Sequence, residues 1–252
     1  MQNFQKILEA LSDFLFPAEC IFCKNFLGEE RILNFCKNCW RKVELIQDSV
    51  CCCCGRPFPS QNVSETAPGF TCENCRKGLY HFDKARAVGK YQGVLQEAIH
   101  QFKYEPTRVG RGKPGLGKHL AKLMVQHLPP DLNLNAFDVI IPVPLHKSRK
   151  RWRGFNQSEI LGRFLGQHYR IPLDTRHLYR IKETRPQVEL TGKERIGNVR
   201  GAFEVQRAKD LEGKKVVLVD DVFTTGSTVN ESSRILKKAG VREILVLTLA
   251  RA

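Results

Sequence analysis

The sequence predicts an α/β protein, with a parallel β-sheet flanked by helices and a small cysteine-rich domain before it. Three apolar runs, 137–141, 216–219 and 243–250, are too short for buried helices and are typical of strands covered on both faces. Helical patterns lie between them. All ten cysteines lie before residue 76. The composition therefore divides the chain into a cysteine-rich domain, 1–80, and an α/β domain, 81–252.

The totals are those of a globular protein with a sizeable core: 252 residues, 42% apolar and 27% charged. The net charge of +15 favours polyanionic partners such as nucleic acid, a phosphorylated substrate or an anionic membrane surface, although a solvated basic surface needs no partner. No apolar run is long enough to span a bilayer, and the N-terminus lacks a signal-peptide pattern. We therefore expect a cytoplasmic protein without a membrane span.

The first predicted element is an amphipathic helix over 4–16, which Pro17 ends. Its apolar stripe is expected to pack on the following domain. A membrane-surface helix is the less favoured alternative, because Glu9 and Asp13 oppose Lys6 on its polar face.

Eight of the cysteines form four Cys-x2-Cys pairs. Two such pairs bring four thiolates together, as a tetrahedral Zn²⁺ site requires. In a chain without an export signal, this pattern indicates metal rather than disulfides. We predict one or two structural zinc ions and no open position for catalysis; the expected ligands are Cys20, Cys23, Cys36 and Cys39 in one set, and Cys51, Cys54, Cys72 and Cys75 in the other.

Some features of the cysteine-rich domain stay open in the sequence. Cys52 and Cys53 allow other registers, but only Cys51 with Cys54 gives the two-residue spacing before a glycine. The pairs could combine sequentially or in a cross-braced way. Zinc could serve only to stabilise a segment too small for a core of its own, or the ribbons could also contact DNA or a protein. The segment 57–69 is predicted to be a loop.

The α/β domain begins with a predicted strand, 84–91, and a helix, 94–102. Lys103 and Tyr104 then lead into a glycine- and basic-rich stretch, 105–118, which could move over a ligand or form a plain surface loop. A helix is expected over 116–128.

The predicted strand 137–141 ends in a proline-rich turn that leads to a strongly basic segment. Residues 147–153 place five cations in seven positions, and a helix is expected over 159–168. Loops at the carboxyl ends of neighbouring parallel strands share one crevice. We therefore expect 147–153 to be a cation-lined loop that holds a phosphate group, with a solvated turn as the alternative.

The strand 216–219 runs into Asp220 and Asp221, followed by the small, hydroxyl-rich segment 224–228 and a helix over 229–238. Free backbone N–H groups and the helix dipole make such a helix start suitable for phosphate. Carboxylates beside a phosphate suit sugar hydroxyls or hydrated Mg²⁺, whereas the alternative is a solvated turn. Further strands are expected at 178–181 and 203–205, with helical spacing over 191–199.

The stretch 216–228 resembles the 5-phosphoribosyl pyrophosphate (PRPP) signature of type I phosphoribosyltransferases, an apolar strand, two acids and then T-T-G-x-T. The resemblance implies that Asp220 and Asp221 bind the ribose hydroxyls and that Mg²⁺ arrives with PRPP. It also implies that the 5-phosphate lies on Thr224, Thr225, Gly226, Ser227 and Thr228.

Over nearly its whole length, the chain also resembles the ComF family. The matching motifs are the cysteine pairs, F-K-Y at 102–104, P-V-P-L, R-G-F-N-Q and a long R-P-Q…G-A-F segment. The resemblance implies a zinc ribbon joined to a type I phosphoribosyltransferase-like domain, with a role in DNA uptake during competence. The stretch after Tyr104 is longer than usual for the family, and Cys52 and Cys53 are extra.

Three functional hypotheses follow. The first is a phosphoribosyltransferase with an unidentified acceptor, whose pyrophosphate or anion site is formed by Lys103, Pro144, Leu145, His146, Lys147, Arg149, Arg151 and Arg153. The second is a competence protein that binds single-stranded DNA and DNA-uptake partners, with the PRPP site as a sensor or relic. The third is a regulator that senses nucleotides.

Overall fold

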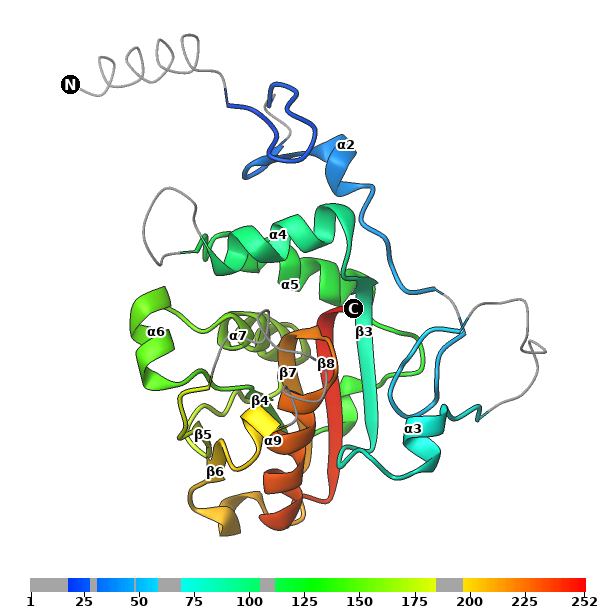
Figure 1. The fold of residues 1–252 in the computed structure, drawn as a ribbon, viewed down its shortest axis with the longest axis vertical. Helices are drawn as coiled ribbons and strands as arrows, with labels where there is room; N and C mark the ends of the chain where they lie inside the picture. Colours follow the sequence, from blue (N-terminus) through cyan, green and yellow to red (C-terminus); the bar gives the residue numbers. More distant parts are fainter. Residues whose placement is uncertain (1–17, 28–30, 48, 59–68, 105–111, 185–196) are drawn as a thin grey trace.

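The computed structural model describes residues 18–27, 31–47, 49–58, 69–104, 112–184 and 197–252 (Figure 1). Four sequence predictions fall wholly or partly outside these ranges. They are the helix over 4–16, most of the loop 57–69, the first half of the glycine- and basic-rich stretch, and most of the segment 185–199.

A parallel sheet forms the centre of the α/β part, as the sequence predicts. It contains β3 (Lys84–Lys90), β4 (Val139–Pro142), β7 (Lys215–Phe223) and β8 (Glu243–Arg251), in the order β3-β8-β7-β4. All three strand pairs are parallel. The two central strands are β-branched or leucine-rich and buried on both faces, because helices and cysteine-rich segments cover the sheet.

The two acidic residues lie within β7 rather than after it, contrary to the strand end predicted at Val219. β7 pairs with β8 as far as Phe223, opposite Arg251, whereas β4 stops pairing with β7 at Pro142. Residues 220–223 of β7 therefore pair with β8 only, and both acids belong to this part of the strand, beyond the point where β4 has ended.

Alternate residues of the central strands point into two cores. On one face, Val217 and Val219 pack with α4 (Gly93–Lys103), α5 (Leu116–Gln126) and α7 (Gln157–Tyr169). On the other, Val216 and Leu218 pack with α9 (Ser227–Lys238) and the hairpin of β5 (Leu178–Arg180) and β6 (Phe203–Val205). These helices and strands confirm the predicted α/β architecture.

The basic segment 147–153 is a helix, α6 (Lys147–Arg153), so its prediction as a loop is wrong. At its start, the backbone N–H of Ser148 is 3.4 Å from Nδ1 of His146, which accepts this bond. At its end, Gly154 adopts a left-handed conformation with φ +85° and donates to the carbonyl of Lys150. Lysine, arginine and tryptophan side chains do not oppose a helix, and these two caps stabilise it.

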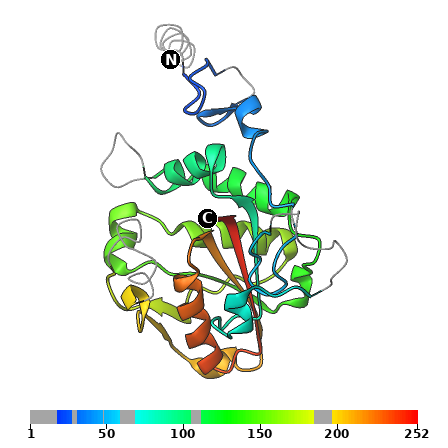
Figure 2. The same ribbon diagram turned by 45° about the vertical axis from the view of Figure 1, so that its right-hand side comes forward.

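The cysteine-rich part covers the outer edge of β3. The segment after α2 (Lys37–Trp40) pairs with this strand through Leu45 and Gly89, and farther along Ala85 donates to the carbonyl of Cys53 at 2.7 Å (Figure 2). A side chain at position 89 would meet Leu95 and the carbonyl of Glu44, which explains the glycine. An edge strand that would otherwise expose unpaired backbone groups is thereby protected.

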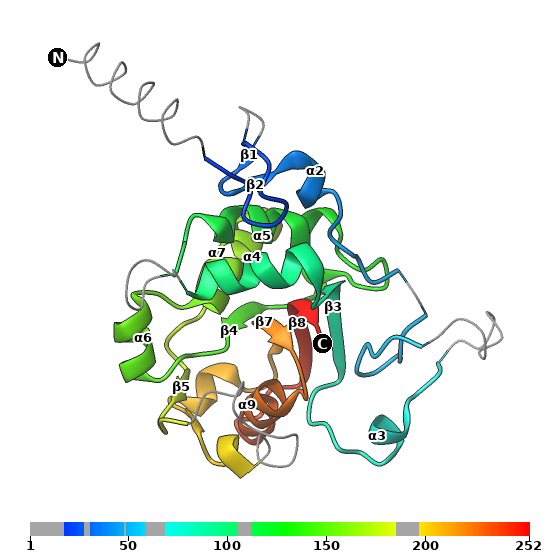
Figure 3. The same ribbon diagram turned by 45° about the horizontal axis from the view of Figure 1, so that its top comes forward.

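The two halves of the cysteine-rich part dock at different places. The first contains β1 (Arg31–Ile32), β2 (Phe35–Cys36) and α2, and packs beside α4 and α5 (Figure 3). The second contains α3 (Glu73–Arg76) and joins the core on the side of α9. The domain boundary after residue 80 stays a prediction. The shorter remaining turns are η1 (Leu134–Ala136) and η3 (Ala208–Leu211).

Among the described helices, none combines the length and the apolar composition that crossing a membrane requires.

Candidate functional site

A cleft of about 620 Å³ lies at the carboxyl end of the sheet, between the ends of β7 and β4. Its floor is the last part of β7 and the turn into α9. Its walls come from α4, from the turn after β4 with α6 and α7, and from β5. The sequence-predicted residues that line it are Lys103, Leu145, Arg149, Arg153, Asp220, Asp221, Thr224, Thr225, Gly226, Ser227 and Thr228.

The two carboxylates have different partners. Asp221 is 8% exposed, and one of its oxygens lies 2.8 Å from Nζ of Lys103 at the end of α4. Asp220 accepts a hydrogen bond of 2.9 Å from the hydroxyl of Ser158, in the first turn of α7. The open edge beyond β4 lets both helices reach the acids.

The electrostatics of the pair favour a ligand that stabilises negative charge. Burial, followed by the neighbouring Asp221, raises the pKa of Asp220 to about 7, although Lys103 and Ser158 oppose the rise. Burial opposes the charge of Lys103, but the two carboxylates outweigh it and raise the pKa of Lys103. Sugar hydroxyls or a divalent cation at Asp220 would therefore stabilise its ionised form.

The turn after β7 is shaped to hold an anion against the start of α9. Gly226 has φ +76°, and a side chain there would lie 2.5 Å from the ring of Phe223. The hydroxyls of Thr225 and Ser227 are 2.7 Å apart, and the N–H of Ser227 points to the Thr225 hydroxyl at 3.4 Å. The first N–H groups of this twelve-residue helix face the cleft end of the sheet. Residues 224–228 are called the phosphate loop below.

Opposite the phosphate loop, the cleft is rich in cations. Arg153 is 4% exposed and lies over the ring of Tyr104, 5.1 Å from its centroid. Burial lowers the pKa of Arg153, and burial with the nearby Arg149 lowers the pKa of Arg180 to about 10. Because the buried guanidinium charges are unfavourable without a counter-charge, a bound anion would stabilise them.

Several buried donors in the cleft have no partner within the described part of the chain. They are Nε of Arg153, Nε of Arg180 and the amide nitrogen of Gln157, a residue only 1% exposed. A buried donor without an acceptor is unfavourable. Ligand oxygens are the natural acceptors for such groups.

Four predicted anion-site residues are not among those that line the cleft: Pro144, His146, Lys147 and Arg151. His146 instead caps α6, and its ring also contacts the Ser148 hydroxyl at 2.8 Å. Lys147 and Arg151 are exposed to solvent on α6. Because 147–153 is helical, successive side chains point in different directions, and only Arg149 and Arg153, four residues apart, reach the cleft.

Other lining residues were not assigned to the site from sequence. Ser158 and Gln157 belong to the R-G-F-N-Q-S run, and Tyr104 follows Lys103, so a motif marked their neighbourhood. Arg180 lies in a short strand without a local signal. Only the packing of β5 beside the cleft places its guanidinium there.

The eight predicted zinc ligands gather in two sets of four sulfur atoms, each within 4.8 Å of one another. The sets combine sequential pairs, Cys20–Cys39 and Cys51–Cys75, and not cross-braced ones. Sulfur–sulfur distances of 3.5 to 3.8 Å within the sets agree with tetrahedral thiolates about 2.3 Å from one zinc ion. None of the ten cysteines forms a disulfide. The residues present thus fit structural zinc.

Backbone N–H groups support both sets. Cys36 donates to Sγ of Cys20 at 3.4 Å, and Cys72 donates to Sγ of Cys51 at 3.3 Å. Cys52 lies outside the second set, with its sulfur 3.3 Å from the hydroxyl of Thr71. Cys53 also lies outside it, and burial raises the pKa of its thiol.

Comparisons with known proteins agree with this geometry. The model of the double zinc ribbon domain matches residues 11–76, and the model of the phosphoribosyl transferase domain matches residues 173–252. The first match covers both cysteine sets, and the second covers the acids and the phosphate loop. Together they confirm the predicted combination of a zinc ribbon and a phosphoribosyltransferase-like domain.

Similarity to whole proteins extends over almost the entire chain. Competence protein F of Haemophilus influenzae is 33% identical over 94% of this chain and 98% of that protein. DNA utilization protein YhgH of Salmonella typhimurium is 30% identical over 93% of this chain and 97% of that protein. Adenine phosphoribosyltransferase from Leishmania donovani, a solved structure, is 14% identical with a TM-score of 0.36, over 66% of this chain and 83% of that one.

Proposed function

Because the chain belongs to the ComF family, together with competence protein F and DNA utilization protein YhgH, we propose that it is a phosphoribosyltransferase-like protein that binds PRPP with Mg²⁺. One observation carries the proposal. Two acids, the buried Asp221 and the partly buried Asp220, lie two residues before the phosphate loop, in a cleft whose opposite wall presents cations and unpartnered donors. PRPP has hydroxyls, a phosphate and a pyrophosphate in a matching arrangement.

Each part of the ligand has a proposed partner. The ribose hydroxyls would donate hydrogen bonds to Asp220 and Asp221, and the 5-phosphate would accept hydrogen bonds from the backbone N–H groups of the phosphate loop. The pyrophosphate would lie toward Arg149, Arg153 and Lys103, where guanidinium groups can make bidentate contacts. Mg²⁺ bound with PRPP would neutralise part of the pyrophosphate charge.

The same arrangement suits transfer of the phosphoribosyl group. A nucleophile would form a bond to C1 of the ribose while the bond from C1 to pyrophosphate breaks, and the nucleophile would lose its proton to solvent. The protein would act mainly by positioning the two reactants and stabilising charge. The acceptor is left open.

Calorimetric titration of PRPP in the presence of Mg²⁺ tests the binding proposal. Wild-type protein should bind, and the double variant Asp220→Asn/Asp221→Asn should bind at least about tenfold more weakly, because hydrogen bonds to charged groups contribute about 1.5–3 kcal/mol each. Glu204→Gln, an exposed acid on β6, is the control that should bind normally. A pyrophosphate-release assay with candidate bases would then test turnover. Wild-type protein that neither binds PRPP nor releases pyrophosphate would contradict the proposal.

We also propose a second function, single-stranded nucleic-acid binding during DNA uptake, consistent with the names of the relatives. The observation in its favour is the outer face of α6, where Lys147, Lys150 and Arg151 are exposed beside Trp152, which is 48% exposed. Cations that contact phosphates next to an aromatic ring that stacks on bases are typical of single-strand binding.

Salt-dependent binding to a single-stranded oligonucleotide tests this second function. Lys150→Ala/Arg151→Ala should weaken binding and reduce its dependence on salt, because a protein that contacts fewer phosphates releases fewer counterions from the oligonucleotide when it binds. Lys214→Ala/Arg242→Ala removes the same charge from exposed positions at the other end of the sheet and is the matched control. No binding at low salt would exclude the function. Competition between PRPP and the oligonucleotide would place both in one cleft.

A further inference from the structure

The second cysteine set (Cys51, Cys54, Cys72 and Cys75) is connected to the phosphate loop through two short paths. The first starts at the carbonyl of Cys54, which accepts a hydrogen bond of 2.8 Å from Nη1 of Arg251. The guanidinium of Arg251 lies 4.2 Å from the ring centroid of Phe223, at the end of β7. That ring fills the space beside Gly226, where a side chain would come within 2.5 Å of it.

The second path runs from α3 to α9. The N–H of Leu79, just after α3, donates to the carbonyl of Asn74 at 3.2 Å. The side chain of Asn230 then donates to the carbonyl of Leu79 at 2.9 Å and accepts from the N–H of His81 at 2.7 Å. Asn230 belongs to the first turn of α9. The first path therefore ends at Phe223, just before the phosphate loop, and the second ends at Asn230, just after it.

Aromatic packing joins the two paths. Tyr80 and Phe82, in the segment that follows α3, stack at 4.8 Å, and both contact the Phe223 ring edge-on at 6.3 and 6.1 Å. Cys51, Cys54 and Cys72 share the same buried cluster with Phe82 and Phe223. Because such a cluster is closely packed, a shift of the cysteine knuckles changes the position available to Phe223.

The first cysteine set offers a control within the same molecule. Cys20 and Cys39 pack in the other core cluster, against α4 and α5. Among the described residues, the hydrogen bonds of Cys20, Cys36 and Cys39 lie within residues 20–42, and none of them reaches the phosphate loop. The two sets have the same four-cysteine ligand chemistry, but only the second is connected to the phosphate loop by the contacts described above.

We propose that Arg251 and Asn230 are positioning residues that couple the second cysteine set to the phosphate loop, so that metal binding by this set and sugar-phosphate binding in the cleft strengthen each other. The coupling to PRPP rests on the proposed function. The dependence of the loop on the cysteine set does not. Coupling of this kind is reciprocal: a ligand that favours the ordered loop also favours the metal-bound knuckles.

Hydrogen exchange of the full-length protein tests the structural part without any ligand. Cys75→Ser, which removes one sulfur of the second set, should increase amide exchange in 222–231, whereas Cys23→Ser, which removes one sulfur of the first set, should leave that segment protected. Equal protection of 222–231 in both variants would overturn the inference. Because Cys75→Ser could unfold a larger region, a second pair of variants is needed.

Arg251→Gln and Asn230→Ala keep all eight cysteine ligands and break the two paths. Both should retain the wild-type zinc content but bind PRPP at least about fivefold more weakly, the lower end of typical coupling between sites. Arg242→Gln, an exposed arginine on the turn before β8, should bind PRPP like wild type. Unchanged PRPP affinity in both path variants, when wild type binds PRPP, would overturn the coupling.

Zinc release gives the reciprocal readout. Saturating PRPP should slow chelator-driven loss of one of two zinc ions in wild type, and this protection should disappear in Arg251→Gln. If wild type binds no PRPP, the proposed function fails, and the exchange experiment still decides whether the cysteine set controls the loop. If PRPP binds but protects neither zinc ion, the inference fails and the proposed function stands.

Discussion

At the scale of single residues, Asp220 is a carboxyl group whose ionised form is unfavourable in the folded protein. Its carboxylate lies in the cleft beside Asp221, and burial together with this neighbour raises its pKa to about 7 from a usual value of 3.8. Between these two pH values, the folded protein holds a proton that the unfolded chain has lost. The contribution of Asp220 to stability therefore falls as pH rises from about 4 to about 7.

This shift gives a testable pH dependence. Asp220→Asn should raise the free energy of unfolding more at pH 8 than at pH 5, by about 1–3 kcal/mol, because each unit of pKa shift corresponds to about 1.4 kcal/mol. Denaturant unfolding at the two pH values measures the difference. Glu204→Gln, an acid-to-amide change at an exposed position on β6, is the control for the substitution itself. An equal effect of Asp220→Asn at both pH values would mean that the carboxyl titrates normally.

Gly226 provides a second prediction at this scale. Alanine there must adopt φ +76° and place its side chain against Phe223, so Gly226→Ala should cost about 1–3 kcal/mol of stability and weaken PRPP binding. Gly213→Ala is a matched control, because Gly213 has φ +71° with nothing within 4 Å of an added side chain. Thermal unfolding and PRPP titration of both variants separate the steric effect from the backbone effect. Similar losses in the two variants would show that the Phe223 contact is unimportant.

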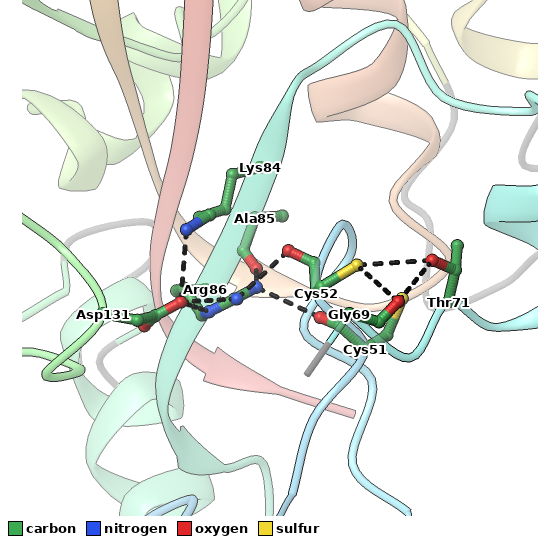
Figure 4. A network of polar contacts seen from close by, with 8 residues as sticks. All are labelled: Cys51, Cys52, Gly69, Thr71, Lys84, Ala85, Arg86 and Asp131. Atoms are coloured by element: carbon green, nitrogen blue, oxygen red, sulfur yellow. Dashed lines mark hydrogen bonds and ion pairs between the residues drawn. The ribbon is translucent and has the colours of Figure 1, made fainter. Parts of the chain in front are cut away.

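At the scale of elements, strand β3 depends on the cysteine-rich part that covers it. Arg86 is 7% exposed and donates to the carbonyls of Cys51 at 3.2 Å and Cys52 at 3.1 Å, while it also binds Asp131 at 2.6 Å (Figure 4). The guanidinium thus connects the strand, the second cysteine set and the turn before β4. A guanidinium has five N–H donors, so one arginine side chain can donate to all of these acceptors.

Arg86→Ala should therefore destabilise the protein by about 2–4 kcal/mol, because it leaves buried carbonyls without a donor. Lys84→Ala is the matched change, since Lys84 contacts the same carboxylate of Asp131 at 3.3 Å but its side chain is 39% exposed. We expect it to cost less than about 1 kcal/mol. Chemical denaturation of the two variants provides the test. A similar, small effect of both would remove the role assigned to Arg86.

The sequence did not predict helix α6. Its run of cations suggested a loop, but each of its residues tolerates a helix, and His146 and Gly154 form the caps. Charge density describes the solvent and ligand preferences of a segment and says little about its backbone. The helix decides that Arg149 and Arg153, but not Arg151, line the cleft, and the prediction of a loop could not make this distinction.

At the scale of the whole molecule, the cysteine sets hold separate parts of the fold together. Metal analysis should find two Zn²⁺ per chain, and Cys51→Ser should retain one. Cys52→Ser, next in sequence but outside the set, should retain two. Because ligand binding contributes directly to folding in small zinc modules, chelation should lower the melting temperature of wild type. Two zinc ions in Cys51→Ser, or one in Cys52→Ser, would show a different register.

The sequence by itself determined the local features: the strand periodicity, the Cys-x2-Cys spacing and the acidic pair before T-T-G-S-T. Each of these depends on residues close together in the chain, so the parallel sheet and the gathering of the cysteines could be predicted, and residues 224–228 could be proposed as a phosphate site. Only the tertiary structure decided that Ser158 and Arg180 reach the same cleft as Lys103, and that Arg251 and Asn230 join it to one cysteine set. These contacts link residues far apart in sequence, and their partners are selected by the order of the strands and the point at which β4 ends.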